Sequence, residues 1–374
     1  MDASRASPEI PEDIVTNVLL NLPVKSLLRF KCVSRPWRSL ISQSQFTKNH
    51  LNRATGSNND KLARYGYLDF KSHPSRESVN FCSCEVLSNV GRVTKFEYPF
   101  GSYFLNAEIL GSCNGLLLIG KSSETLYLWN PSTREYKKFS IPYSDGARHF
   151  LWGLGFDSSS DDYKVVRVVR CKSQAPIAKF YSVKSNSWSD YRDFPYRTFH
   201  NQVGIILNKS LHWIVNHAKP INQNSAMKVI VCFDPTMEQF DEIQLPYWAV
   251  KYSKIELGLL GGSLCISHIH DNCCVSLWTM KQCTVNECWT KLFTIPFPLG
   301  YVKPLAYREN GEVVMEVNRN RLVTYKPVDG KFTRVLQCDN NGGFKVVPLG
   351  DNDGLVQQQA QGKRKGEEKR LVSC

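Results

Sequence analysis

IPEDIVTNVLLNLPVKSLLRFKCVSRPWRSLISQSQFTKNHL, residues Ile10–Leu51, is the only clearly helical stretch of the sequence. A first helix is predicted to open at Pro11, because a proline in the first turn loses no hydrogen bond. The acidic pair Glu12 and Asp13 interacts favourably with the positive end of the helix dipole. The apolar residues that follow share one face of this amphipathic helix, at Ile14, Val18, Leu19 and Leu22.

Two further short helices are predicted after Pro23, which ends the first one. The second carries Leu27, Leu28 and Phe30, and the third follows Ser34, a suitable N-cap, with Pro36 in its first turn and Trp37, Leu40 and Ile41 on one face. Three such helices in about 40 residues hold more large apolar side chains than so small a bundle can bury. We therefore expect part of this apolar surface to contact something else, as in a docking module.

The pattern running from Ile10-Pro11 through Leu22-Pro23-Val24-Lys25-Ser26-Leu27-Leu28 to Trp37-Arg38-Ser39-Leu40-Ile41 closely resembles the F-box of plant proteins. It departs from that pattern at Ile10, where leucine is commoner, and at Arg35-Pro36, which could shorten or shift the third helix. The resemblance implies binding to a Skp1-type adaptor and, through it, to the cullin and RING protein of a ubiquitin ligase. It assigns the adaptor-facing positions to Pro11, Ile14, Leu22, Pro23, Leu27, Leu28, Val33 and Trp37. The alternative is an ordinary three-helix capping subdomain.

Strand periodicity replaces helical periodicity after a polar linker predicted at residues 52–61. From residue 62 to about residue 350, a strand, a turn and an aromatic residue recur at Leu126–Tyr136, Phe180–Trp188, Val231–Phe240 and Leu322–Phe332, and with a longer loop at Val275–Trp289. Each unit has an upstream hairpin near a glycine, at Gly111, Gly153, Gly204, Gly258 or Gly311. The spacing of about 45 residues is typical of propeller blades, and Tyr65–Phe100 makes a sixth unit. The predicted fold is α+β and multidomain, with a three-helix module before an all-β, propeller-like domain of about six blades.

This β region resembles the type 1 F-box-associated domain of plant proteins. The likeness lies in GSCNGLLLI (111–119), LWNPSTREYKKF (128–139), GLGFDSSSDDYKVVRV (153–168) and FDPTMEQFDEIQLP (233–246). Within that kelch-like family the chain resembles most the branch that restrains constitutive immune signalling, and it is also similar to the S-locus F-box proteins. The resemblance implies that the β domain binds a protein target, which the sequence does not identify.

Composition limits the remaining classes of function. Hydrophobic residues make up 42% of the 374, which is enough for a large core, and no apolar run reaches the length of a membrane span. Outside the helical module and the tail, the basic residues behind the net charge of +13 are scattered, so we expect no specific nucleic-acid partner. Thirteen cysteines, an odd number, fit free thiols in a reducing compartment, and residues 1–9, a flexible leader, lack the apolar segment of a signal peptide. We expect a cytoplasmic and nuclear protein.

Several motifs suggest chemistry that their context does not support. Gly115–Ser122 matches the phosphate-loop pattern, but strand residues occupy the positions that need a flexible loop. His268, His270, Cys273 and Cys274 have the residue types of metal ligands without zinc spacing, and adjacent strand residues point to opposite faces. The run 157–162, DSSSDD, reads as a hairpin turn, because it lacks the glycine and the final glutamate of a calcium loop. The sequence predicts no catalytic residue, metal or cofactor.

The predicted function is target recognition within a ubiquitin ligase. Aromatic residues of the longer loops are the candidate target contacts, or else they merely cover blade edges: Trp152, Tyr191, Tyr196, Tyr247 and Trp248. The tail, residues 351–374, is expected to be disordered, and its basic run at 363–370 is a candidate nuclear-import signal. A non-degrading scaffold and a propeller enzyme with a metal or acid cluster on its axis remain as alternatives.

Overall fold

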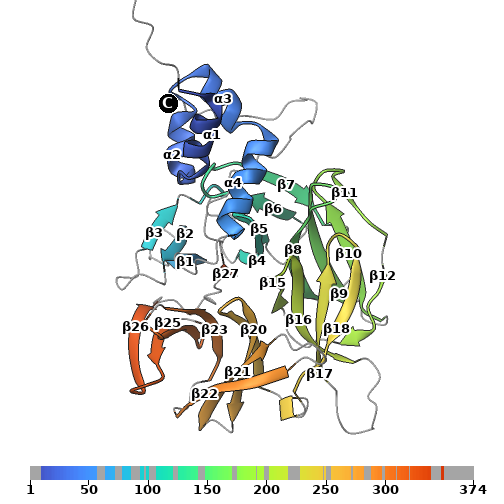
Figure 1. Cartoon of the computed structure of the whole chain (residues 1–374). Coiled ribbons are helices and arrows are strands. Elements are labelled where there is room, and N and C mark those ends of the chain that lie inside the picture. The colour runs from blue at the N-terminus through green and yellow to red at the C-terminus, as the bar shows by residue number, and fades with distance from the viewer. Residues whose placement is uncertain are drawn as a thin grey trace, which may run out of the picture.

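The computed structural model describes residues 10–56, 64–71, 78–85, 93–96, 98–100, 107–120, 125–141, 148–170, 175–190, 192–197, 202–217, 228–246, 248–249, 254–270, 273–281, 288–296, 300–308, 310–319, 321–337 and 347–348. Four helices open the chain, and strands follow (Figure 1). No helix in these ranges has the length and apolarity that a membrane crossing requires. The leader at 1–9 and the tail at 351–374 lie outside the described residues.

The helical module contains the three predicted helices and one more. Its members are α1 (Glu12–Leu20), α2 (Val24–Phe30), α3 (Arg35–Ile41) and α4 (Ser44–Gly56). Pro11 and Pro23 are the N-caps of α1 and α2, and the Ser34 side chain accepts a hydrogen bond of 3.2 Å from the Trp37 N–H. Pro36 therefore lies in the first turn of α3, where its missing N–H costs little. Because α4 runs to Gly56, it occupies the first part of the linker that was predicted at 52–61.

One small core holds the four helices together. Its buried side chains come from all of them: Leu19, Leu20, Val24, Leu27, Ile41 and Phe46. The buried ring of His50 lies 2.9 Å, through Nε2, from the Leu22 carbonyl oxygen, which ties α4 to the connection between α1 and α2. The fourth helix thus closes the core that the first three leave open.

Within the described residues the strands form six sheets, each a propeller blade, as predicted. The first comprises β1 (Arg64–Lys71), β2 (Ser78–Glu85), β3 (Val93–Phe96) and β27 (Val347–Pro348). The second comprises β4 (Glu108–Cys113), β5 (Leu116–Gly120), β6 (Thr125–Trp129) and β7 (Tyr136–Ser140). The third comprises β8 (Arg148–Asp157), β9 (Asp162–Arg170), β10 (Ile177–Ser182), β11 (Ser187–Trp188), β12 (Arg192–Asp193) and β14 (Gln202–Val203).

The other three blades complete the ring seen in Figure 1. The fourth has β13 (Tyr196–Arg197), β15 (Ile205–Leu207), β16 (Ser210–His217), β17 (Lys228–Asp234) and β18 (Gln239–Ile243). The fifth has β19 (Ile255–Leu260), β20 (Ser263–His270), β21 (Cys274–Lys281) and β22 (Cys288–Ile295). The sixth has β23 (Val302–Tyr307), β24 (Val313–Val317), β25 (Arg321–Lys326) and β26 (Lys331–Gln337).

The ring closes where the end of the chain returns to its first blade. Strand β27 pairs with β1, with Pro348 opposite Tyr65. The Tyr65 hydroxyl donates a hydrogen bond of 2.5 Å to the Leu305 carbonyl of the sixth blade. Pairing between distant parts of the chain covers strand edges that would otherwise be open to other chains.

The recurring glycines permit close approach between blades. A Cβ added at Gly111 on β4 would lie 2.8 Å from the backbone nitrogen of Leu154 on β8, and one at Gly258 would collide with the Pro304 carbonyl oxygen of the next blade. Glycine is therefore required where one inner strand lies against the next. Gly311 differs, because its φ of +78° places it in a turn.

Tryptophans join neighbouring blades with a repeated hydrogen bond. The indole Nε1–H of Trp188, on the outer strand of the third blade, donates to the Ser140 carbonyl of the second at 2.9 Å. Trp289, on the outer strand of the fifth blade, donates to the Gln244 carbonyl of the fourth at 3.0 Å. Each large apolar ring thus covers an edge while its polar atom is satisfied. Trp188 and Trp289 therefore join adjacent blades.

Candidate functional site

The helical module carries an apolar surface that the chain leaves uncovered. Ile10, Ile14, Val18 and Val33 are 67%, 51%, 56% and 63% exposed, and they are half of the large apolar side chains exposed within the described residues. Ile14 and Val18 lie four residues apart on α1 and so share one face of the helix, and Ile10 lies just before the helix. An exposed apolar stripe on a folded module is typical of a protein-binding surface.

The adaptor-facing positions expected from the sequence divide into three groups. Pro11, Ile14, Pro23 and Val33 are exposed. Leu22, Leu28 and Trp37 are half-buried and pack against the module core. The Trp37 and Phe30 rings meet edge to face, with their centroids 5.4 Å apart. Leu27 is fully buried, because it lies on the face of α2 that packs into the module core. The expectation that Leu27 faces the adaptor is therefore wrong for the free chain. Val18 was not assigned to that surface, although its spacing from Ile14 pointed to it.

Replacing Leu27 with alanine should unfold the helical module rather than remove an adaptor contact. A buried leucine lost from a core typically costs about 2–5 kcal/mol, and so small a module has little stability in reserve. Hydrogen exchange should show loss of amide protection throughout α1–α4. Ile14→Ala is the matched control, because the Ile14 side chain lies half in solvent. Equal protection in the two variants would contradict the burial assigned to Leu27.

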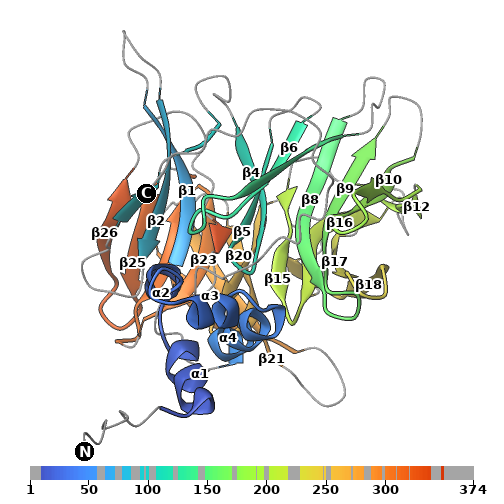
Figure 2. The same ribbon diagram turned by 90° about the horizontal axis from the view of Figure 1, so that it is seen from above.

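The module sits against one end of the propeller strands (Figures 1 and 2). Lys48 of α4 forms an ion pair of 3.0 Å with Asp161, in the turn between β8 and β9. Lys31, just after α2, lies near Glu135 in the turn between β6 and β7; burial and the nearby Arg38 lower the pKa of Lys31, and Glu135 partly opposes them. The module therefore contacts the β8–β9 turn of the third blade and lies near the β6–β7 turn of the second.

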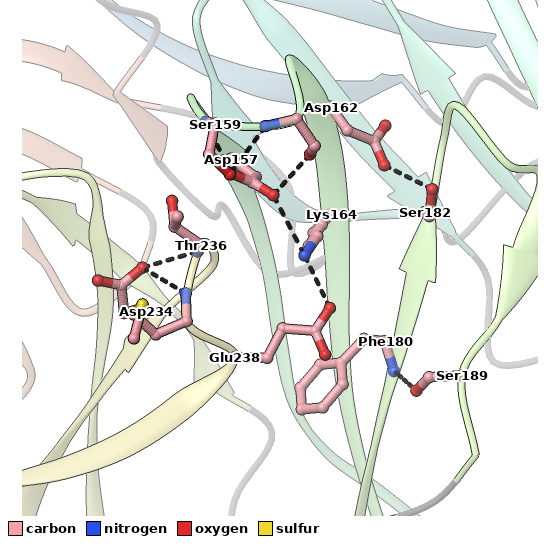
Figure 3. A network of polar contacts seen from close by, with 12 residues as sticks. Asp157, Ser159, Asp162, Lys164, Phe180, Ser182, Ser189, Asp234, Thr236 and Glu238 are labelled. Carbon is pink, nitrogen blue, oxygen red and sulfur yellow. Dashed lines mark hydrogen bonds and ion pairs between the residues drawn. The ribbon is translucent and has the colours of Figure 1, made fainter.

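A polar network fixes the β8–β9 turn beneath that contact (Figure 3). The Asp157 carboxylate accepts hydrogen bonds from the hydroxyls of Ser159 and Ser160, at 2.7 and 2.6 Å, and from their backbone N–H groups. Lys164 lies between Asp157, at 3.4 Å, and Glu238 of the fourth blade, at 2.7 Å. These hydrogen bonds hold the turn internally, and the Lys164–Glu238 ion pair anchors it to the fourth blade. The position of Asp161, which pairs with Lys48, is therefore well defined.

Hydrogen bonds outweigh burial in setting the charge of Asp157. Burial by itself raises the pKa of this carboxyl group, but the two serine hydroxyls and their backbone N–H groups bring the pKa well below its usual range. The carboxylate consequently contributes stability at any pH above the unfolded value of about 4, and that contribution is lost as the pH falls from there toward the folded pKa.

Asp157→Asn should therefore lower stability at neutral pH, and by progressively less as the pH falls below about 4. Hydrogen bonds to a charged group contribute about 1.5–3 kcal/mol, so we expect a loss of that size at pH 7, shrinking progressively below about pH 4. Urea unfolding of both proteins from pH 7 to pH 3 measures it. Asp161→Asn in the same turn is the control, because the ion pair of Asp161 is exposed and worth little. A deficit independent of pH would contradict the role of the charge.

The candidate target contacts do not gather on one surface. Trp152 and Tyr196 are buried, in the cores beside β8 and β16, so the structure removes them as surface contacts. Strand β8 is long enough to place Trp152 within the sheet, where a loop had been expected. Trp248 is half-buried, with its ring centroid 4.9 Å from that of His268 on β20 and 4.5 Å from that of Trp278 on β21. Tyr191 and Tyr247 lie outside the described residues.

The phosphate-loop match and the acidic run at 157–162 both lie in regular β structure. Leu116–Gly120 is strand β5, and Asp157–Asp162 closes a hairpin. His270 Nε2 lies 2.9 Å from the Ser276 hydroxyl. Across the ranges described, no group of three or more His, Cys, Asp or Glu side chains could hold a metal ion.

Comparison with known proteins agrees with this division of the chain. The family described as F-box domain matches residues 8–49, and the F-box associated beta propeller domain matches residues 75–360. The F-box protein CPR1 of Arabidopsis thaliana is 30% identical over 90% of this chain and 87% of its own length. An F-box/kelch-repeat protein of the same plant is also 30% identical, over 86% of this chain and 89% of its own.

A solved oligogalacturonate lyase in complex with manganese is similar at a TM-score of 0.40, with 10% identity over 70% of this chain and 72% of its own, a likeness too distant to carry an argument. The family matches, by contrast, span most of the chain: the first ends within α4, and the second begins after β1 of the first blade. The chain belongs to the F-box proteins that carry an F-box-associated β-propeller domain.

Proposed function

We propose that this chain is the substrate-recognition subunit of an SCF (Skp1–cullin–F-box) ubiquitin ligase. The observation that carries the proposal is the uncovered apolar surface of Ile10, Ile14, Val18 and Val33 on a module that matches the F-box domain. Full burial of one such side chain contributes about 1.5–3 kcal/mol, so four partly exposed ones can supply much of a stable interface. The partner for this surface is a Skp1-type adaptor.

The propeller serves in this proposal as the target-binding domain. In an antiparallel blade the first and third turns lie at one end and the second turn at the other. The F-box module contacts the β8–β9 turn and lies near the β6–β7 turn, and both turns belong to the first set. We therefore assign the target to the opposite end, away from the helices, where no F-box contact competes for the surface.

The chain contributes proximity rather than chemistry. Holding a target and a ubiquitin-charged conjugating enzyme in one assembly raises the local concentration of target lysines near the thioester, an effect that tethering can bring to millimolar. Ubiquitination would be followed by degradation of the target. Regulation of plant defence is the pathway suggested by the branch of the family that the sequence resembles most, and the expected cytoplasmic and nuclear localisation is compatible with it.

Purification of the full chain together with a Skp1-type adaptor tests the first step. A stable one-to-one complex is expected on gel filtration, and failure to form one would overturn the proposal. For the second step, proteins captured by the chain while the proteasome is blocked should have longer half-lives in cells that lack the chain. Captured proteins whose half-lives do not change would instead support a scaffold that binds without degrading.

A further inference from the structure

Two neighbouring cysteines at the far end of the fifth blade bring their sulfur atoms together. Cys273 ends the turn after His270, where its backbone N–H donates to the His270 carbonyl at 2.7 Å, and Cys274 begins β21. The Cys273 thiol donates to the Cys274 sulfur across 3.6 Å. Adjacent strand residues would point to opposite faces, but Cys273 lies outside the strand, so that expectation is wrong for this pair.

The pair is accessible to reagents. Cys273 is exposed and Cys274 half-buried, whereas Cys82, Cys84 and Cys113 are buried thiols. By strand order, the β20–β21 turn lies at the opposite end of the blade from the β19–β20 turn, and so at the end away from the F-box helices. Reagents in solution can therefore reach both sulfur atoms without crossing the F-box contact.

The geometry favours binding one atom through two sulfurs over forming a disulfide. The Cα atoms of neighbouring residues are about 3.8 Å apart across a trans peptide, below the roughly 4.4–6.8 Å that an unstrained disulfide spans. Two sulfur ligands on one tetrahedral centre at about 2.3 Å bond length lie about 3.8 Å apart, and a pyramidal centre such as trivalent arsenic, with its narrower bond angles, brings them slightly closer. The observed 3.6 Å is close to that separation, so the pair can chelate with little movement.

The number of ligands limits what the pair can hold. A structural zinc ion takes four protein ligands, and among the described side chains there is no group of three that could hold a metal. His270, the nearest histidine in sequence, already contacts Ser276 through Nε2. A thiophilic centre that needs two sulfurs and no more is the better match, as in a trivalent arsenical that carries one organic group.

We propose that Cys273 and Cys274 form a dithiol site that binds trivalent arsenicals through both sulfur atoms. With an organoarsenic oxide, two As–S bonds form, the arsenic–oxygen bond breaks, and the oxygen leaves as water with the two thiol protons. The oxidation state of arsenic does not change, so no oxidant or reductant takes part. Burial and the contact with Cys273 raise the pKa of Cys274, so this thiol carries its proton at neutral pH.

Phenylarsine oxide, added to the reduced full-length chain, tests the site. Intact mass spectrometry should show a gain of one reagent less one water, and peptide mapping should place it on the peptide that contains both cysteines. An added small dithiol should reverse it. Cys273→Ser and Cys274→Ser should each weaken binding by about 100-fold or more, because the second sulfur then no longer acts at a high effective concentration.

Cys32→Ser is the matched control, since Cys32 is an exposed cysteine on the F-box and its loss should change nothing. Peptide mapping of the wild-type chain keeps the test decisive even if a serine variant folds poorly. An adduct that maps elsewhere, or one that both single variants retain with wild-type affinity, would overturn the proposal.

Discussion

Replacing both Ile14 and Val18 with aspartate is expected to reduce binding of a Skp1-type adaptor by at least about 100-fold, which corresponds to about 2.7 kcal/mol. Each side chain leaves about half its surface exposed in the free chain, so binding can bury the remainder. Losing that burial costs about 1 kcal/mol per residue, and placing a carboxylate in an apolar interface adds a larger desolvation cost. Isothermal titration of the full chain with the adaptor measures the effect.

The fold should survive this change, because neither residue belongs to the buried core of the module. Met237→Asp is the matched control: Met237 is 63% exposed, as Val33 is, but it lies on the propeller. That variant should bind the adaptor as the wild type does. If the Ile14 and Val18 double variant also binds normally while its helices remain protected from hydrogen exchange, the stripe along α1 is not the adaptor surface.

Local rules of sequence predicted the starts of the helices and the recurring glycine-marked hairpins of the blades. Pro11, Pro23 and Ser34 act as caps because capping depends on the residue itself and its immediate neighbours. Gly111 and Gly258 mark close approaches because no residue with a Cβ fits there. Both features can be read without knowing the partner element, which is why the module and the six blades were predictable.

Features that depend on the partner element were not predictable in the same way. Leu27 and Leu28 are adjacent leucines, and only the packing of α2 on α3 decides that Leu27 faces the core. Trp152 was expected on a loop, but it lies within β8, and its side chain packs into the core that the second blade forms with β8. Helix α4 lacks a broad apolar stripe, and buries Phe46 and His50 instead. In each case a residue's neighbour in space, not in sequence, determines its environment.

Trp213→Ala should destabilise the propeller by about 3–5 kcal/mol, the usual cost of removing a buried tryptophan. The indole ring packs between two glycines, since a Cβ added at Gly153 or at Gly204 would approach its Cζ2 atom to 2.9 or 2.8 Å. Gly153 and Gly204 have no side chain that could move into the space, so a cavity between the third and fourth blades remains. Urea unfolding monitored by far-ultraviolet circular dichroism measures the loss.

Two further variants separate volume from hydrogen bonding at this position. The Trp213 indole N–H donates to the Trp152 carbonyl at 3.1 Å, but that oxygen also accepts the Gly204 N–H at 2.7 Å. Trp213→Phe removes the first bond without leaving the carbonyl unsatisfied, so it should cost distinctly less than Trp213→Ala. Trp188→Ala should also cost less, because the Trp188 ring is only half-buried at a blade edge. If Trp188→Ala and Trp213→Ala lower the free energy of unfolding equally, the packing of Trp213 between inner strands does not limit propeller stability. The outer tryptophans would then contribute as much to holding the blades together.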